Sequence, residues 1–308
     1  MKKIVSVLLL LFLCFSLCAC GKSQYIIAAE NAVKAVGNVT LDSASAIEQA
    51  EKAISALSEE EKKKFKSGAE FEEIKKQYNK LTEEEKVKLA VKKINLIGDV
   101  TLESATAIDE ADKAYQSISE EFRAEVTNVN ELNNAKSSLR KLRAEEKDRV
   151  IAEKTPMFNI NYDKVQDIIW YEHKSLPKYI DIRSYVIPFL GKSGNNYWIS
   201  TRYNYTGDDW IFWNRMTILV DGTKYYKNVG RGNTVRDNDT EVWEYYEEPL
   251  ESNVGMDNSE LKMLKAIAQS DETVIRFEGD DYYYDLTVTP TDKKIISDVL
   301  ALYGALIS

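Results

Sequence analysis

Cysteine is scarce in this chain of 308 residues, and its placement excludes several kinds of site. The three cysteines, Cys14, Cys18 and Cys20, all lie within the first twenty residues. The rest of the chain therefore has no thiol that can form a disulfide, act as a nucleophile or bind zinc.

Histidine is scarcer still, because His173 is the only one. A histidine-based metal site or a Ser-His-Asp arrangement could use this residue alone, and no G-x-S-x-G motif is present. We expect His173 to be a surface or capping residue. The sequence predicts no catalytic residue, no metal ion and no cofactor.

Two short motifs partly imitate ligand-binding loops. Residues 237–241 (DNDTE) place carboxylates at alternate positions as a calcium loop does, but Val242 stands where that loop needs glycine. Residues 191–196 (GKSGNN) resemble a phosphate loop without its full spacing. Both are predicted to be turns. The pairs Asp208-Asp209 and Asp280-Asp281 are expected to be solvated turn residues. They are also the only basis for a less favoured interpretation of the protein as a carboxylate-dependent envelope hydrolase.

The chain is acidic, which restricts its partners. Its formal net charge is −9. Lys2 and Lys3 are the only charged residues of the first twenty and add +2, so the rest of the chain carries −11. Such a chain is a poor ligand for the phosphate backbone, and we expect no nucleic-acid partner. Anionic lipid does not attract it either, so any membrane attachment needs an anchor.

The N-terminus supplies a candidate anchor. Lys2 and Lys3 precede an apolar run from Val5 to Leu17, which is too short for a membrane span and typical of a signal peptide. Leu17-Cys18-Ala19-Cys20 then resembles the lipobox of bacterial lipoproteins. The resemblance implies that Cys20 carries a diacylglyceryl group and becomes the first residue after cleavage. An ordinary secretory leader with an incidental cysteine is the alternative.

That resemblance implies a location and a first division of the chain. Residues 1–19 are expected to be the signal peptide, and residues 20–24 the lipidated N-terminus and a linker. The protein is then attached to the cell membrane on its extracytoplasmic face through acyl chains such as palmitate.

The next part of the chain repeats itself. VGNVTLDSASAIEQAEKA from Val36 matches IGDVTLESATAIDEADKA from Ile97, an offset of 61 residues. Apolar residues recur at steps of three or four, which predicts three amphipathic helices in each repeat. We therefore expect two tandem three-helix modules, residues 25–85 and 86–154.

Local signals place the breaks between these helices. Gly37 and Gly98 are suited to the left-handed conformation that ends a helix. Ser58-x-x-Glu61 and Thr82-x-x-Glu85 are both typical of capping boxes, and Ser58 and Ser119 are expected to begin a short extra turn.

The repeated G-[ND]-V-T-L-[DE]-S pattern resembles helical repeats in surface proteins of Gram-positive bacteria. The resemblance implies an extended, surface-displayed segment without catalytic residues. Two interpretations remain open for the modules: a stalk that lifts the next domain off the membrane, and a docking surface for an envelope protein.

Residues 155–308 have a different composition and pattern. Aromatic and β-branched runs bounded by Gly, Asn and Asp predict antiparallel strands, followed by a helix, a hairpin and a closing helix. The fold class is therefore multidomain: all-α tandem three-helix modules followed by an α+β domain with an antiparallel sheet. The ending resembles the C-terminal part of uncharacterised lipoproteins of Gram-positive bacteria, which implies no activity.

Aromatic residues give the only candidate binding site. All five tryptophans lie beyond residue 155. On residues 196–205 (NYWISTRYNY), alternation places Ile199 and Tyr203 on one face and Trp198 and Arg202 on the other. The second face is a candidate for stacking on a sugar or peptide, and Trp210, Trp213 and Tyr245-Tyr246 raise the same question. The alternative is that these rings only fill a small core and its rim.

The sequence thus predicts a lipid-anchored surface protein that is not an enzyme. In this interpretation a helical stalk presents an α+β domain that binds cell-wall glycan, a peptide or an envelope protein. The alternative is a structural spacer whose helical repeats dock an envelope protein.

Overall fold

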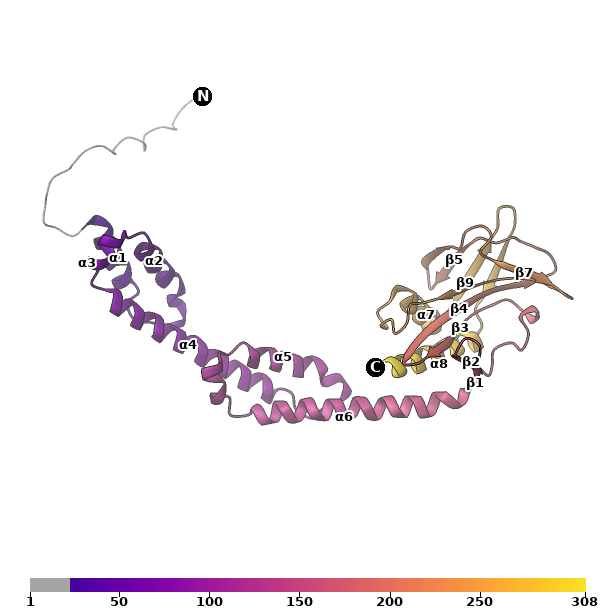
Figure 1. Ribbon diagram of the computed structural model, residues 1–308, viewed down its shortest axis with the longest axis horizontal. Coiled ribbons are helices and arrows are strands. Elements are labelled where there is room, and N and C mark those ends of the chain that lie inside the picture. The colour runs from indigo at the N-terminus through magenta and orange to yellow at the C-terminus, as the bar shows by residue number, and fades with distance from the viewer. Residues whose placement is uncertain (1–22) are drawn as a thin grey trace, which may run out of the picture. The chain divides into compact units, whose positions relative to one another are not determined.

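The computed structural model describes residues 23–308, a helical region followed by a domain with antiparallel sheets (Figure 1). This confirms the predicted fold class. The signal peptide and the lipidated Cys20 lie outside the described residues. The chain forms two compact units, the first ending at Leu139 and the second comprising Arg140–Ser308. Within residues 23–308, none of the helices combines the length and the apolar character that crossing a bilayer requires.

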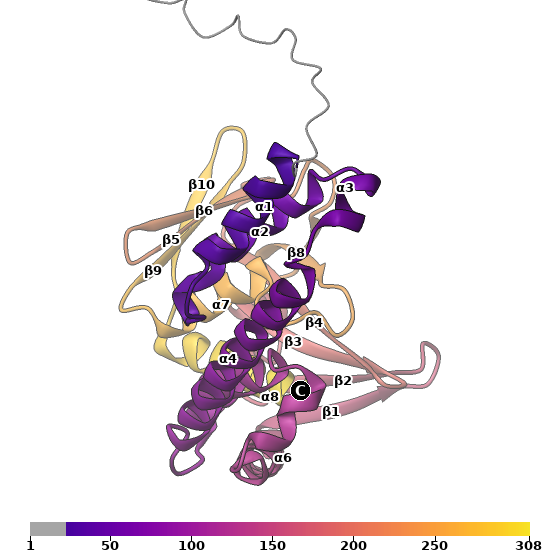
Figure 2. The same ribbon diagram turned by 90° about the vertical axis from the view of Figure 1, so that its left-hand side faces the viewer.

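The first unit begins with one helical module. It contains α1 (Gln24–Ala35), α2 (Ala44–Ser55), α3 (Glu59–Lys64), a 3-10 turn at Leu41–Ser43 and the start of α4 (Gly68–Asn95). Helices α1 and α2 lie side by side in Figure 2. Val33, Ile47 and Phe71 meet in the core of this module, because they occupy one face of each helix.

The second module repeats this arrangement 61 residues later. It contains the end of α4, a 3-10 turn at Leu102–Ser104, α5 (Ala105–Gln116), a 3-10 turn at Glu120–Glu125 and α6 (Val129–Lys154). Its core contains Ile94, Ile108 and Leu132, the exact repeat equivalents of the first core. The predicted helix periodicity is therefore confirmed at the level of buried side chains.

The predicted turn signals have different outcomes. Gly37 and Gly98 adopt φ of 60° and 61°, as predicted. Ser58 accepts a hydrogen bond from the Glu61 amide while the Glu61 carboxylate accepts one from the Ser58 amide, so this capping box is confirmed. The capping box at Thr82 is wrong, since Thr82 lies inside α4 and its hydroxyl donates to the Asn79 carbonyl.

Helix α4 is continuous because both modules use it. Its N-terminal half carries Phe71 into the first core, and its C-terminal half carries Val87 and Ile94 into the second. Glu83, between the two halves, is 4% exposed and accepts a hydrogen bond of 2.8 Å from the Ser119 amide. The sequence boundary at residues 85–86 thus falls within a shared helix.

The second unit contains two antiparallel sheets where the sequence predicted one. Sheet A has six strands in the order β1-β2-β3-β4-β8-β7, and sheet B has four in the order β10-β9-β5-β6. The strands of sheet A are β1 (Phe158–Asp163), β2 (Ile168–His173), β3 (Tyr185–Ser193), β4 (Asn196–Gly207), β8 (Val242–Pro249) and β7 (Val235–Asn238). Those of sheet B are β10 (Tyr283–Thr287), β9 (Thr273–Glu278), β5 (Arg215–Val220) and β6 (Thr223–Asn228).

Two helices complete this unit. Helix α7 (Ser259–Gln269) packs against α8 (Pro290–Ile307), and α8 packs on β3 and β4. Val299 and Tyr303 of α8 share one hydrophobic core with Leu190 and Ile199 of sheet A. One face of sheet A is therefore covered by helix, and the candidate site lies on the other. Two further 3-10 turns occur at Thr155–Met157 and Ile180–Ile182.

Candidate functional site

The pleat of β4 separates its side chains as the alternation predicts. Ile199 and Tyr203 are fully buried on the side of α8. Trp198 and Arg202 point to the opposite face and are partly exposed, with 24% of the Arg202 side chain accessible. This face of sheet A is the candidate binding face.

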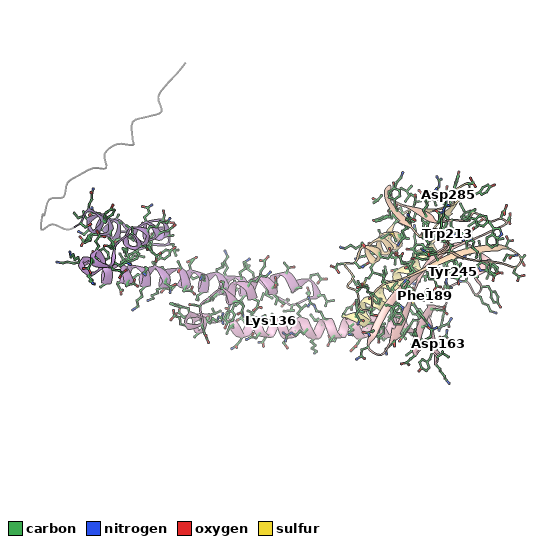
Figure 3. The ribbon with its side chains drawn as sticks, turned by 45° about the horizontal axis from the view of Figure 1, so that its top comes forward. Lys136, Asp163, Phe189, Trp213, Tyr245 and Asp285 are labelled. Carbon is green, nitrogen blue, oxygen red and sulfur yellow. The ribbon has the colours of Figure 1, made fainter. Side chains whose placement is uncertain are left out.

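Cross-strand pairing extends this face over four strands, because directly paired residues of an antiparallel sheet share a face. Trp170 of β2 pairs with Gly191 of β3, which in turn pairs with Trp198. Phe189 and Tyr245 occupy the same face on β3 and β8. We call the set Trp170, Phe189, Trp198, Arg202 and Tyr245 the aromatic row; Figure 3 labels two of its members, Phe189 and Tyr245.

The rings of the row touch one another. The centroid of Trp170 lies 5.6 Å from that of Phe189 and 5.7 Å from that of Trp198, the latter pair edge to face. A Cβ atom at Gly191 would lie 2.2 Å from Cε2 of Trp198. The indole therefore lies across the bare backbone of Gly191, which fixes its position.

Arg202 lies between two rings of the row. Its guanidinium carbon is 5.4 Å from the Phe189 centroid and 5.7 Å from the Tyr245 centroid. Its Nε donates to the Glu247 carboxylate at 2.7 Å. Burial alone would lower the pKa of Arg202, but Tyr185 and Glu247 beside it raise the pKa above its usual range. The row thus holds a fixed cation between aromatic faces.

Such a surface is suited to binding rather than to covalent chemistry. Partly exposed indole rings stack on flat apolar surfaces, and a guanidinium fork donates hydrogen bonds in a fixed plane. A sugar ring and an extended peptide both offer these two features.

The other predicted ligand residues lie elsewhere. Trp213 is fully buried, stacks edge to face on Phe277 at 5.1 Å and donates its indole N–H to the Glu244 carbonyl. It is a core residue that joins sheets A and B, which removes it from the candidate face. Trp210 lies in the loop before β5, stacked on Phe212. Trp170 and Phe189 are members that sequence reasoning missed, although the alternation in β2 and β3 contained the signal.

The sequence predicts a surface or capping position for His173; the structure buries its side chain, which is 7% exposed. Its ring packs edge to face on Phe158 at 5.4 Å, and its Nδ1 accepts a hydrogen bond from the Ser175 amide. Its Nε2 lies 3.4 Å from the buried carboxylate of Asp298, which also pairs with Lys154. Burial lowers the pKa of His173 even though Asp298 opposes the shift. This cluster ties α6, β2 and α8 together.

The two imitation motifs form turns. Residues 191–196 contain the end of β3, a turn at Gly194 and Asn195 with Gly194 at a φ of 57°, and the first residue of β4; residues 237–241 contain the end of β7 and the turn into β8. Across residues 23–308, no group of three or more His, Cys, Asp or Glu side chains is arranged to hold a metal ion.

Comparisons with known proteins found no match for this chain. No protein-family model matches the chain, and no curated protein or solved structure is significantly similar to it.

Proposed function

We propose that this protein is a lipid-anchored binding protein on the extracytoplasmic face of the cell membrane, with no enzymatic activity. Cys20 is the proposed anchor, the helical modules serve as a stalk, and the second unit binds an envelope ligand. The single observation that carries the binding function is the aromatic row, where Arg202 is held between two rings on the face of sheet A opposite α8.

The chemistry of the row favours cell-wall glycan or peptide as the ligand. Phe189 is buried at 7% exposed and anchors the row, whereas Trp170, Trp198 and Tyr245 are each partly exposed and can contact a ligand. The Arg202 side chain already contacts the two rings and Glu247. It is therefore preorganised and loses little conformational entropy on binding.

Cosedimentation of the full chain, purified in mild detergent, with purified cell wall tests this function. The wild type is expected to pellet, and Arg202→Lys is expected to pellet less, because lysine lacks the planar fork that stacks between rings. Tyr226→Ala is the matched control, since Tyr226 is 73% exposed on sheet B, away from the row. Equal pelleting of wild type and Arg202→Lys would argue against the row.

The anchor has its own test. Cys20→Ala is expected to release the protein from membranes or to leave it unprocessed. Recovery of this variant in the membrane fraction at its mature size would contradict lipidation at Cys20.

One observation favours the alternative, docking through the helical repeats. The second module has a hollow of about 480 Å³ lined in part by Val87, Val91 and Leu96, and Leu96 is 69% exposed. In this alternative Leu96→Glu abolishes crosslinking to an envelope protein, while cell-wall binding does not depend on Arg202.

A further inference from the structure

The loop between β4 and β5 presents a second aromatic surface. Trp210 and Phe212 stack with their rings 6.1 Å apart and inclined by 27°. The guanidinium carbon of Arg236 lies 5.5 Å from the Phe212 ring. We call Trp210, Phe212 and Arg236 the Phe212 ledge. Phe212 is 56% exposed although it is a large apolar residue.

The backbone of the ledge is strained. Phe212 has a φ of 50°, a left-handed backbone conformation that residues other than glycine rarely adopt. Such strain persists only where the surrounding structure enforces it, and it is concentrated at functional sites. The residues that enforce it are therefore informative.

A buried carboxylate enforces this conformation. Glu244 has no exposed surface, and its Oε1 accepts hydrogen bonds from the amides of Ile211 and Phe212, both at 2.8 Å. Its Oε2 accepts from the Trp213 amide at 3.1 Å and from Nε of Arg236 at 2.9 Å. A buried charge is costly unless it is fully bonded, so this one is used to hold a loop that exposes a ring.

A neighbouring turn holds the same loop from its other side. A Cβ atom at Gly279 would lie 1.9 Å from the carbonyl oxygen of Ile211, so the two backbones are in contact. The Tyr205 hydroxyl donates to the Asp209 carbonyl at 2.8 Å, and burial raises the pKa of Tyr205 to about 12, which keeps that donor protonated. The ledge is thus fixed before any ligand arrives.

The side chains next to the ledge define its chemistry. Tyr282, on the turn that begins at Gly279, is 63% exposed. Asp208, in the loop before β5, and Asp281, in the turn after Gly279, are both exposed. The exposed large apolar residues of segments 208–214 and 279–284 are all aromatic, with no exposed aliphatic side chain among them. Rings beside carboxylates suit sugars, whose C–H faces stack and whose hydroxyls donate hydrogen bonds to carboxylate oxygens.

We infer that the Phe212 ledge is a second binding site, which takes a neutral polysaccharide by stacking a pyranose ring on Phe212. Arg236 is already paired with Glu244, so the exposed carboxylates of Asp208 and Asp281, together with the negative net charge of the chain, disfavour anionic glycans and anionic lipid as occupants. Glu244 and Tyr245 are adjacent on β8, so the ledge and the aromatic row lie on opposite faces of sheet A. The inference therefore goes beyond the proposed function and does not depend on it.

Binding of soluble oligosaccharides to the full chain tests this site. The probes are the hexamers of N-acetylglucosamine and of glucose, with oligogalacturonate as the anionic comparison, and tryptophan fluorescence is the readout. At least one neutral hexamer is expected to bind, and Phe212→Gly is expected to weaken that binding by at least tenfold. Glycine accepts a positive φ, so this variant removes the ring and keeps the loop. Phe212→Ala is the second variant, and Tyr226→Ala is the control that keeps wild-type affinity.

Each other outcome is decisive. The site is overturned if neither neutral hexamer binds, if Phe212→Gly binds as the wild type does, or if oligogalacturonate binds better than both. Binding lost in Trp198→Ala but kept in Phe212→Gly would assign the glycan to the aromatic row instead. Failure of cell-wall pelleting with retained hexamer binding would remove the proposed function and leave the ledge.

Discussion

Trp198 lies across Gly191, its directly paired neighbour on β3, so closely that a Cβ atom at residue 191 would be 2.2 Å from the indole. Any side chain at this position displaces the ring. The glycine at position 191 therefore sets the position of the Trp198 indole, and the aromatic row depends on this pair.

Gly191→Ala tests that dependence. The added methyl group is expected to push the indole out of the row, at a cost of about 1–3 kcal/mol in the free energy of unfolding. Cell-wall binding is expected to fall several-fold, because Trp198 loses its contact with Trp170. Urea unfolding and cosedimentation measure the two effects, with Ser193→Ala on the same strand as the control. A destabilised variant with unchanged wall binding would show that Trp198 takes no part in it.

His173 makes stability depend on pH near neutrality. Burial lowers the pKa of His173 in the folded state, so the unfolded chain binds more protons once the pH falls below about 6.5, the ordinary histidine value. The contribution of His173 to the free energy of unfolding is therefore expected to be complete well above this pH and to be lost progressively as the pH falls from 7.5 to 5.5. The groups that face the ring are Asp298 and Lys294 of α8 and Lys154 of α6.

The variant His173→Gln isolates this effect, since the chain has no other histidine. Urea unfolding at several pH values is expected to show a flatter dependence in the variant than in the wild type over that range. Parallel curves for the two proteins would mean that another group is responsible.

The second unit is expected to need the end of α6. Ile151 packs against its core, Nζ of Lys154 lies 3.0 Å from the buried carboxylate of Asp298, and Nζ of Lys147 donates to the Ser308 carbonyl. A fragment of residues 140–308 should therefore be more stable than residues 155–308 by at least about 2 kcal/mol. Urea unfolding of the two fragments is the measurement. Equal stability of the two fragments would favour the domain boundary at residue 155 that the sequence predicts.

Ser58 and Thr82 form a matched pair for the helical unit. Ser58→Ala is expected to cost about 1 kcal/mol, because the Glu61 amide loses its cap. Thr82→Ala is expected to change stability by less than about 0.5 kcal/mol, since alanine is the better residue inside a helix. Thermal unfolding of both variants decides the matter, and a larger loss at Thr82 would mean that α4 is interrupted there.

Much of this fold could be predicted from local patterns. The spacing of apolar residues by three or four positions predicts that Val33, Ile47 and Phe71 are buried. The alternation in β4 likewise predicts that Ile199 and Tyr203 belong to the core. Glycines with positive φ marked turns at Gly37 and Gly98. These features depend on residues near one another in the sequence, which is why the sequence alone predicts them.

The errors depend on long-range partners. A capping box and a continuous helix look alike at Thr82 until the packing of Val87 on a second core is known. The β1–β2 hairpin is hard to predict because its turn at residues 164–167 contains no glycine or proline, and Asp167 supplies the positive φ. The burial of Trp213 and His173 follows from Phe277 and Asp298, which lie more than sixty residues away.

The most direct test of the account is a binding isotherm of the wild type and Trp198→Ala on increasing amounts of purified cell wall. Removal of the indole from the aromatic row is expected to weaken binding about tenfold or more, while the unfolding profile of the rest of the second unit is retained. Identical isotherms for the two proteins, or no binding by the wild type, would contradict the claim that sheet A is a binding surface.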